Sequence, residues 1–275
     1  MKKVLVTGSK GMLGQDLCPM LEENGFKVIK TYLDNLDITN FNQAQYVIQY
    51  YNPDFVIHCA AYTNVDKAEE DTKKAFLINA QGTENLAKIC AEKDIPIVYI
   101  STDYVFNGES SKPYMPETPR NPIGIYGKSK ADGEIAIEKY CKKYYIVRTS
   151  WLYGHKGKNF VETIIDLAQK MPEIKVVNDQ FGCPTWTVDL AEFIIKLIKE
   201  NKPYGIYHCC GTGITSWHEF ACEIVNLLEI ASEVKPCATD EFPRPAKRPK
   251  YSAMANLGTC QHWKKALKKY IEMRG

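Results

Sequence analysis

Tyr126 and Lys130 have the types and spacing for proton transfer. They are four positions apart at the start of a predicted helix that runs to about residue 140, so they share one face, whereas Lys128 points elsewhere. A lysine cation about 4 Å from a phenol, at an effective dielectric near 20, favours the phenolate by about 4 kcal/mol. That energy matches the roughly three pKa units between an ordinary tyrosine and neutral pH. Tyr126 is therefore a candidate proton donor to a carbonyl oxygen during hydride reduction.

Thr102 is the third candidate catalytic residue. It follows a predicted strand at 95–100, in the run Ser101-Thr102-Asp103-Tyr104-Val105-Phe106, and its hydroxyl can hydrogen-bond a carbonyl and orient it. The alternative for an isolated Tyr-x-x-x-Lys is a solvated helix pair without function. We favour catalysis because the pair follows a nucleotide-binding half and lies beside this Ser-Thr strand exit.

Three glycines predict where a dinucleotide binds. Gly8, Gly11 and Gly14 stand between an apolar strand at 3–7 and a helix at 15–23. In this context the first glycine turns the chain, the second admits a pyrophosphate close to the backbone, and the third lets the helix pack on the strand. The free N–H groups of the helix's first turn face the anion. The alternative is a glycine-rich turn with no ligand, and the flanking strand and helix make nucleotide binding the better interpretation.

In nicotinamide-binding folds, the end of the second strand carries the residue that contacts the adenine ribose. Here that strand is predicted at 26–32. An acidic residue there binds the 2′-hydroxyl of NADH, and a nearby arginine accepts the 2′-phosphate of NADPH. This chain has Thr31, Tyr32 and Leu33 instead, so either NADH or NADPH is compatible with the sequence. Asp37-Ile38 follows and is placed to flank the adenine.

Alternating strand and helix patterns predict an α/β fold, a doubly wound parallel sheet of Rossmann type with a smaller C-terminal substrate-binding domain. Ligands of such sheets bind at the carboxyl ends of the strands. We expect residues 1–150 to form the dinucleotide-binding domain, rejoined by about 185–204, and residues 151–275 to form mainly the substrate-binding domain. Further strands are predicted at 55–61, 146–151 and 207–210, and further helices at 40–51, 72–93, 187–200 and 216–230.

Composition narrows the classes of function. A net charge of +2 gives no indication of nucleic-acid binding, and no stretch approaches the roughly 20 apolar residues of a membrane span. The N-terminus lacks the apolar core of a signal peptide, which predicts a cytoplasmic protein. Ten cysteines contain no C-x-x-C pair, and the five histidines do not join them at zinc spacing, so we expect reduced thiols and no metal.

The sequence resembles the extended short-chain dehydrogenase/reductases, through its Gly8-x-x-Gly11-x-x-Gly14 and Tyr126-x-x-x-Lys130 motifs. Within that family it is similar to the dTDP-4-dehydrorhamnose reductases over about residues 3–252. The resemblance implies NAD(P)H-dependent reduction of the 4-keto group of a nucleotide-linked 6-deoxy sugar, dTDP-4-dehydrorhamnose to dTDP-rhamnose, for surface polysaccharide biosynthesis. The blocks that carry this closer similarity are residues 60–69, 101–106, 148–151, 178–182 and 248–249.

The resemblance also implies roles for individual residues. Substrate would contact Thr102, Asp103 and Trp151, whose indole face suits a pyranose, while Arg248 would pair with the sugar diphosphate. The alternative interpretations are that Trp151 is an ordinary core aromatic and that Arg248 is a solvated charge in a proline-rich loop. The catalytic set would be Thr102, Tyr126 and Lys130. The residues implied to bind the cofactor are Gly8, Gly11, Met12, Leu13, Gly14, Asp37, Ile38, Ala60, Ala61, Tyr62, Thr63, Tyr126 and Lys130.

Two rival functions remain open. A nucleotide-sugar dehydratase or epimerase shares the family, but a dehydratase needs an Asp-Glu pair beside the catalytic threonine, and here Asp103 is followed by Tyr104. The second rival function is a non-catalytic, nucleotide-binding regulatory subunit. The presence of the full catalytic set argues against it. A homodimer is compatible with the sequence. Some relatives bind magnesium at a dimer contact, yet here only Gln15, Asp16 and Asp189 lie in the relevant regions, and we do not predict that metal.

Overall fold

A parallel sheet organises the chain. The structure, a computed structural model, describes residues 1–274, and in that part six strands pair in the order β10-β5-β4-β3-β1-β2. The order reverses beside β1, which has β2 on one side and β3 on the other. Reversal points of this kind open a crevice at the carboxyl ends of the strands. The strands are β1 (Lys3–Thr7), β2 (Lys27–Lys30), β3 (Phe55–His58), β4 (Ile97–Thr102), β5 (Tyr144–Thr149) and β10 (Gly205–His208).

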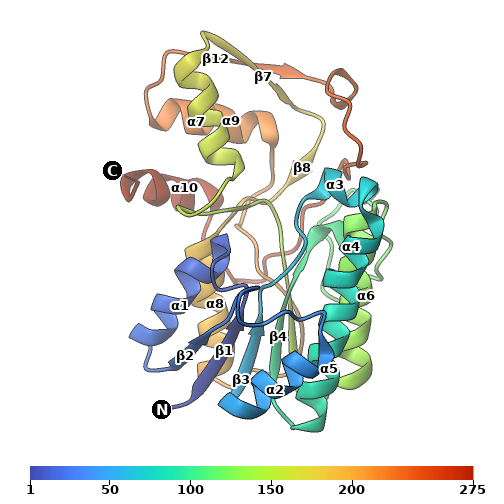
Figure 1. Cartoon of the computed structure of the whole chain (residues 1–275). Coiled ribbons are helices and arrows are strands. Elements are labelled where there is room, and N and C mark those ends of the chain that lie inside the picture. Colours follow the sequence, from blue (N-terminus) through green and yellow to red (C-terminus); the bar gives the residue numbers. More distant parts are fainter. Residues whose placement is uncertain (275) are drawn as a thin grey trace.

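Helices cover both faces of the sheet, which confirms the doubly wound prediction (Figure 1). On one face, α1 (Met12–Glu23) and α8 (Thr187–Lys199) share a buried cluster with the sheet, so the later helix does return to it. On the other face a second cluster joins α2 (Phe41–Tyr51), α5 (Thr83–Glu92) and α6 (Ile125–Tyr140). Over residues 1–274, none of the helices combines the length and apolar content that spanning a bilayer would need.

The helix predicted at 72–93 has a more complex form. It begins as α4 (Thr72–Phe76), widens into a π-helical turn at Leu77–Gly82, and continues as α5. Such turns often lie at functional sites because they re-aim side chains. Here the turn directs Asn79 to the segment after β3: its amide nitrogen donates to the Tyr62 carbonyl (3.0 Å) and its oxygen accepts from the Tyr62 N–H (2.7 Å).

A second lobe lies above the carboxyl ends of the strands (Figure 1). Its core packs Ile164, Phe220 and Trp263 together. The pattern of the sequence is weakest here, where α7 (Phe160–Lys170), β7 (Glu173–Val177) and β12 (Glu233–Cys237) are absent from the sequence prediction. Also absent is α3 (Val65–Glu70), which packs on α6 of the sheet lobe. The elements outside the sheet lobe's core are α3 (Val65–Glu70), the 3-10 turns Asp103–Val105 and Thr239–Glu241, β6 (Leu152–Tyr153), α7 (Phe160–Lys170), β7 (Glu173–Val177), β8 (Phe181–Gly182), β9 (Thr185–Trp186), β11 (Thr215–Ser216), α9 (Trp217–Leu227), β12 (Glu233–Cys237) and α10 (Trp263–Glu272).

We propose a division into two domains along these lobes. Residues 1–150, together with about 185–204, supply the sheet lobe, and β10 adds its edge strand immediately afterwards. Residues 151–275 otherwise supply the second lobe, of which residue 275 lies outside the described residues. The separate buried cluster of the second lobe supports this division.

Candidate active site

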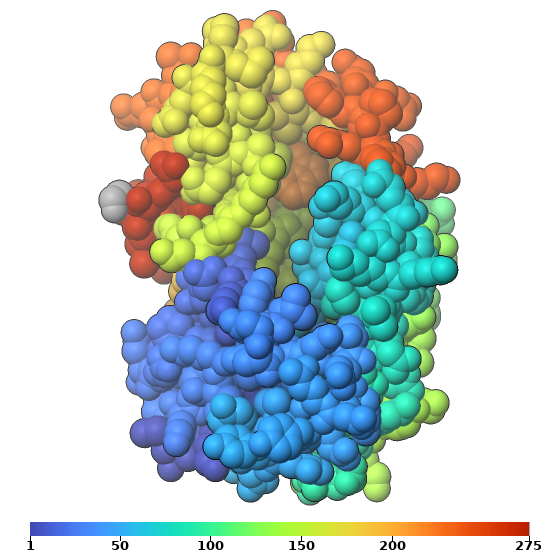
Figure 2. Space-filling model, viewed as in Figure 1, coloured from blue at the N-terminus to red at the C-terminus, as the bar shows by residue number. Residues whose placement is uncertain are grey.

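A cleft of about 640 Å³ lies at the carboxyl ends of the sheet strands. In Figure 2 it is the hollow between the two lobes, bounded by the blue, cyan and yellow-green segments. Two of the site residues predicted from the sequence, Tyr62 and Arg248, do not line it. Those that do are Gly8, Gly11, Met12, Leu13, Gly14, Asp37, Ile38, Ala60, Ala61, Thr63, Thr102, Asp103, Tyr126, Lys130 and Trp151.

The glycine loop has the geometry of an anion cradle. Gly8 has a φ of +67°, and a Cβ there would lie 2.7 Å from the Ala60 nitrogen. A Cβ on Gly14 would lie 2.6 Å from the Gly8 carbonyl oxygen, so both positions require glycine. Gly11 caps α1 without any side-chain hydrogen bond, and only the Gly8 oxygen approaches within 4 Å of its missing Cβ. The first N–H groups of α1 therefore face open space that fits a pyrophosphate.

At the adenine end, Thr31 does not face the cleft. Its buried hydroxyl donates to the Val6 carbonyl (3.0 Å), which turns the side chain into the sheet. Lys30 forms an ion pair with Glu22 (2.9 Å). A second ion pair, between Lys10 and Asp34, lies beside the same strand end and was not predicted from the sequence.

Thr102 and Tyr126 meet at the centre of the cleft. The Thr102 hydroxyl donates to Asp103 Oδ1 (2.9 Å) and accepts from the Tyr104 N–H (3.2 Å). Tyr126 lines the same cleft, and its side chain lies near that of Thr102. Burial raises the pKa of Tyr126 to about 12, although the neighbouring Thr102 hydroxyl opposes that shift. Tyr126 is thus fully protonated near neutral pH, which is the form that can donate a proton.

Lys130 lies on the same helix face as Tyr126 but does not act on it as the spacing suggested. Its ammonium donates to the Ile100 carbonyl (2.6 Å) and lies 4.0 Å from the centre of the Tyr99 ring. The expected lowering of the Tyr126 pKa by Lys130 is therefore wrong for this state of the protein. Burial also lowers the pKa of Lys130 itself to about 7, with the Glu134 charge partly opposing. The lysine is partly uncharged near neutral pH, which weakens its pull on a phenolate.

A buried ion pair fixes the two strand ends that carry the site. Glu134, one helical turn beyond Lys130, forms two hydrogen bonds with Arg148 of β5 (2.9 and 2.7 Å) and accepts one from Ser101 of β4 (2.5 Å). Burial alone would raise the pKa of Glu134, but Arg148 outweighs it and holds that pKa below its usual value. Sequence inspection missed this role, although Glu134 shares the helical spacing of Tyr126 and Lys130.

Trp151 lines the cleft with one indole face already covered. Its ring stacks on Trp217 with centroids 3.5 Å apart, and a Cβ on Gly182 would lie 2.5 Å from its Cε2 atom. Its backbone is left-handed, with a φ of +47°, which is unusual for a bulky residue and costs roughly 1–3 kcal/mol. The chain thus holds this indole in a strained but well-supported position at the cleft.

Arg248 lies behind the cleft and joins the two lobes. Its guanidinium forms two hydrogen bonds with Asp66 of α3, one of them of 2.9 Å. The hydrogen bond from Arg248 is the main reason that the pKa of Asp66 is lowered. Tyr104, which is close enough to Arg248 to influence its pKa, does line the cleft.

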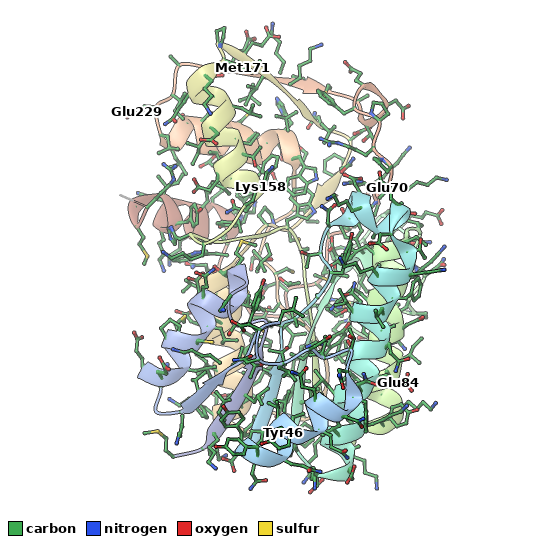
Figure 3. All side chains as sticks on the ribbon, in the orientation of Figure 1. Tyr46, Glu70, Glu84, Lys158, Met171 and Glu229 are labelled. Carbon is green, nitrogen blue, oxygen red and sulfur yellow. The ribbon has the colours of Figure 1, made fainter. Side chains whose placement is uncertain are left out.

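Lys158 lines the cleft and was not predicted. It lies in a loop that Asn159 holds together by donating to the Gly154 carbonyl (2.8 Å), and Figure 3 labels it between the two lobes. A Cβ on neighbouring Gly157 would lie 3.8 Å from Met12 Cβ, so this loop runs over the glycine loop. Lys158 could have been predicted from the run Gly154-His155-Lys156-Gly157-Lys158, since glycine and lysine together favour anion binding.

Comparisons with known proteins agree with this geometry. The chain matches the family described as RmlD substrate binding domain over residues 1–274. It is 41% identical to the spore coat polysaccharide biosynthesis protein SpsK of Bacillus subtilis, covering 100% of this chain and 98% of that protein. The crystal structure of a dTDP-4-dehydrorhamnose reductase from Clostridium acetobutylicum has 47% identity and a TM-score of 0.96, covering 98% of this chain and 99% of the other. That of a dTDP-4-dehydrorhamnose reductase from Bacillus anthracis in complex with NADP has 41% identity and a TM-score of 0.96, covering 99% of each.

With a match across all the described residues, this chain belongs to the RmlD substrate binding domain family.

Proposed function

We propose that this chain reduces the 4-keto group of dTDP-4-dehydrorhamnose to give dTDP-rhamnose, with NADPH or NADH as the reductant. The observation that carries the proposal is that two hydroxyl side chains, Thr102 and Tyr126, line one cleft whose other end is a glycine cradle. The similarity to reductases of this name supports the choice of substrate, and the likeness to a spore coat polysaccharide protein supports a role in surface polysaccharide synthesis.

The cofactor fits the residues present. Gly8, Gly11 and Gly14 leave room for a pyrophosphate at the N-terminus of α1, and Asp37-Ile38 flanks the far end of the cleft where an adenine would lie. Ala60, Ala61 and Thr63 would follow the cofactor along the crevice. Tyr62 does not line it, and its N–H and carbonyl are held by Asn79. Met12, Leu13, Tyr126 and Lys130 complete the set.

When bound, NADPH or NADH supplies the hydride that adds to the carbonyl carbon. Thr102 holds the carbonyl oxygen by hydrogen bonding, and Tyr126 donates its phenolic proton to the same oxygen as negative charge develops there. One hydride and one proton thus convert the ketone to an alcohol. Lys130 binds the nicotinamide ribose and, in its charged form, stabilises the phenolate left on Tyr126.

The sugar and its diphosphate occupy the side of the cleft toward the second lobe. Asp103 and the accessible part of Trp151 contact the sugar. Burial raises the pKa of Asp103 to about 6, although the hydrogen bond from Thr102 opposes that shift, so this carboxyl can change charge near neutral pH. Arg248 binds the diphosphate by exchanging part of its contact with Asp66 for the ligand, because a bidentate guanidinium suits either anion.

The test is to follow loss of NADPH and NADH absorbance with a panel of nucleotide-linked 4-keto sugars. We expect one reduced cofactor to be consumed for each sugar alcohol formed, with dTDP-4-dehydrorhamnose the best substrate. Mass spectrometry of the product should show a gain of two hydrogens.

The same assay separates the rival functions. A protein that retains NAD through purification and converts sugar without net loss of reduced cofactor would be an epimerase. A protein that turns over none of the panel would contradict the proposal and favour the regulatory class. Expected instead is a protein that purifies without tightly held NAD, since a reductase must release oxidised cofactor in every cycle.

A further inference from the structure

Two cysteines outside the cleft lie unusually close together. The Sγ atoms of Cys209 and Cys260 are 3.2 Å apart, in a chain whose ten cysteines are all free thiols. Neither residue lines the described cleft, and within residues 1–274 no three His, Cys, Asp or Glu side chains converge as metal ligands would. The pair therefore needs an explanation other than substrate binding or metal coordination.

The backbone holds both thiols in place. Cys209 follows β10 at once, and its N–H donates to the Arg148 carbonyl (2.8 Å), so it continues the edge of the sheet. Cys260 lies in the loop that leads to α10, where its carbonyl accepts from the Thr212 hydroxyl (3.0 Å) and the Asn256 amide (3.3 Å). A disulfide needs an S–S distance of about 2.05 Å, so the two sulfurs are about 1 Å from bonding.

The two thiols differ in access. Cys209 is fully buried, whereas Cys260 is only partly buried and can meet a small reagent. Burial, and then the hydrogen bond to Cys260, raises the pKa of the Cys209 thiol well above its usual range. Cys260 is therefore the thiol that reacts first, because the more accessible thiolate is the nucleophile in exchange reactions.

We propose that Cys209 and Cys260 form a thiol–disulfide site that reacts with small organic disulfides. The Cys260 thiolate attacks one sulfur of the reagent, which breaks the reagent's S–S bond and releases one thiol. Cys209 then attacks Cys260 Sγ in the mixed disulfide, releases the second thiol and forms the Cys209–Cys260 bond. The protein loses two hydrogens and two electrons, and the small disulfide becomes two thiols.

Oxidation would join the edge strand of the sheet to the loop that precedes α10. The two cysteines are 51 positions apart, so the bond closes a long loop in the unfolded chain and lowers its conformational entropy. We expect the oxidised protein to melt higher than the reduced protein, by on the order of 5 °C. Reductase turnover should be little changed, since neither sulfur lines the cleft.

The experiment treats the full chain with bis(2-hydroxyethyl) disulfide under non-denaturing conditions, then alkylates the remaining thiols in denaturant and records the intact mass. We expect the mass of one internal disulfide, eight alkylated thiols and a raised Tm that returns to the starting value on reduction. Peptide mapping without reduction should join the segment that contains Cys209 to the one that contains Cys260.

Single variants assign the bond, because Cys209 and Cys210 are neighbours in one peptide. Cys260→Ser, at a partly exposed position that should tolerate the change, is expected to lose both the link and the rise in Tm. Cys210→Ser is the control, because Cys210 is as buried as its neighbour Cys209. This variant should keep both the link and the rise in Tm. A link between Cys183 and Cys210, whose thiols both donate to the Met254 carbonyl, would overturn the proposal, as would a stable mixed disulfide at Cys260 or no reaction at all.

Discussion

Lys130 should impose a fall in activity as the pH rises through neutrality. Burial lowers its pKa from 10.5 to about 7 in the free protein, with the Glu134 charge and Cys59 partly opposing. Because the pKa is lowered, the cation is present below pH 7 and is lost above it. In the proposed mechanism, the charged form holds the nicotinamide ribose and stabilises the Tyr126 phenolate. Cofactor capture and proton transfer should therefore both weaken as the ammonium deprotonates.

The size of the effect follows from that value. With a pKa of about 7, half of the lysine is charged at pH 7 and about 1% at pH 9, so kcat/KM for the cofactor should drop about 50-fold between these two pH values. An ordinary lysine would keep its proton over the same range. Tyr126 cannot cause the fall, because its pKa of about 12 lies far above it.

The assay is the pH profile of kcat/KM for NADPH at saturating sugar, a quantity that reports groups of the free protein. Lys130→Arg keeps its charge at every pH in the range and should flatten the profile, even if its absolute rate is lower. Lys128→Ala, on the exposed face, should retain the original profile. Asp103→Asn is the control for the other nearby titrating group, because it removes the carboxyl whose pKa is about 6. A profile that stays level to pH 9, or one that still falls near pH 7 in Lys130→Arg, would refute the argument.

Four other outcomes test the site. Tyr126→Phe should lower kcat by about two to four decades with Tm unchanged, measured by cofactor absorbance and thermal melting, because the proton donor is lost. NADH and NADPH should give kcat/KM values within about tenfold of each other when assayed in parallel, since the cleft presents neither a free carboxylate nor an arginine for the ribose; a hundredfold preference would contradict this. Lys158→Ala should raise the Kd of both cofactors by the same factor, about fivefold by fluorescence titration, whereas exposed Lys156→Ala should not. Gly182→Ala should raise KM for the sugar about tenfold and leave KM for the cofactor unchanged, because the new Cβ would lie 2.5 Å from the Trp151 ring.

The sheet lobe could be predicted because its information is local. Each buried strand is a short apolar run, each helix has its own apolar face, and Gly8, Gly11 and Gly14 follow directly on β1. The carboxyl-end rule for parallel sheets then placed Thr102 near Tyr126 without knowledge of any contact. Strand and helix bounds differ from the prediction by only a few residues for the same reason.

The second lobe could not be predicted because its contacts join distant segments. β7 pairs with β12, so Glu173 lies opposite Glu233, and nothing near either strand indicates the partner. Arg248 reaches Asp66 across the two lobes in the same way. Contacts of this kind depend on the completed fold. The local sequence around each of these residues predicts only a loop or a solvated charged side chain.

The limits of local spacing are clearest on α6. Tyr126, Lys130 and Glu134 are four positions apart and lie on one face, so spacing alone would pair each with its neighbour. In the structure Glu134 instead binds Arg148 and Ser101, and Lys130 turns to the Ile100 carbonyl. The helix therefore contributes a donor and a cation while its carboxylate anchors the strand ends. Removing one partner of a buried pair of this kind typically costs about 3–5 kcal/mol, so the geometry between Thr102 and Tyr126 depends on a charge that touches neither.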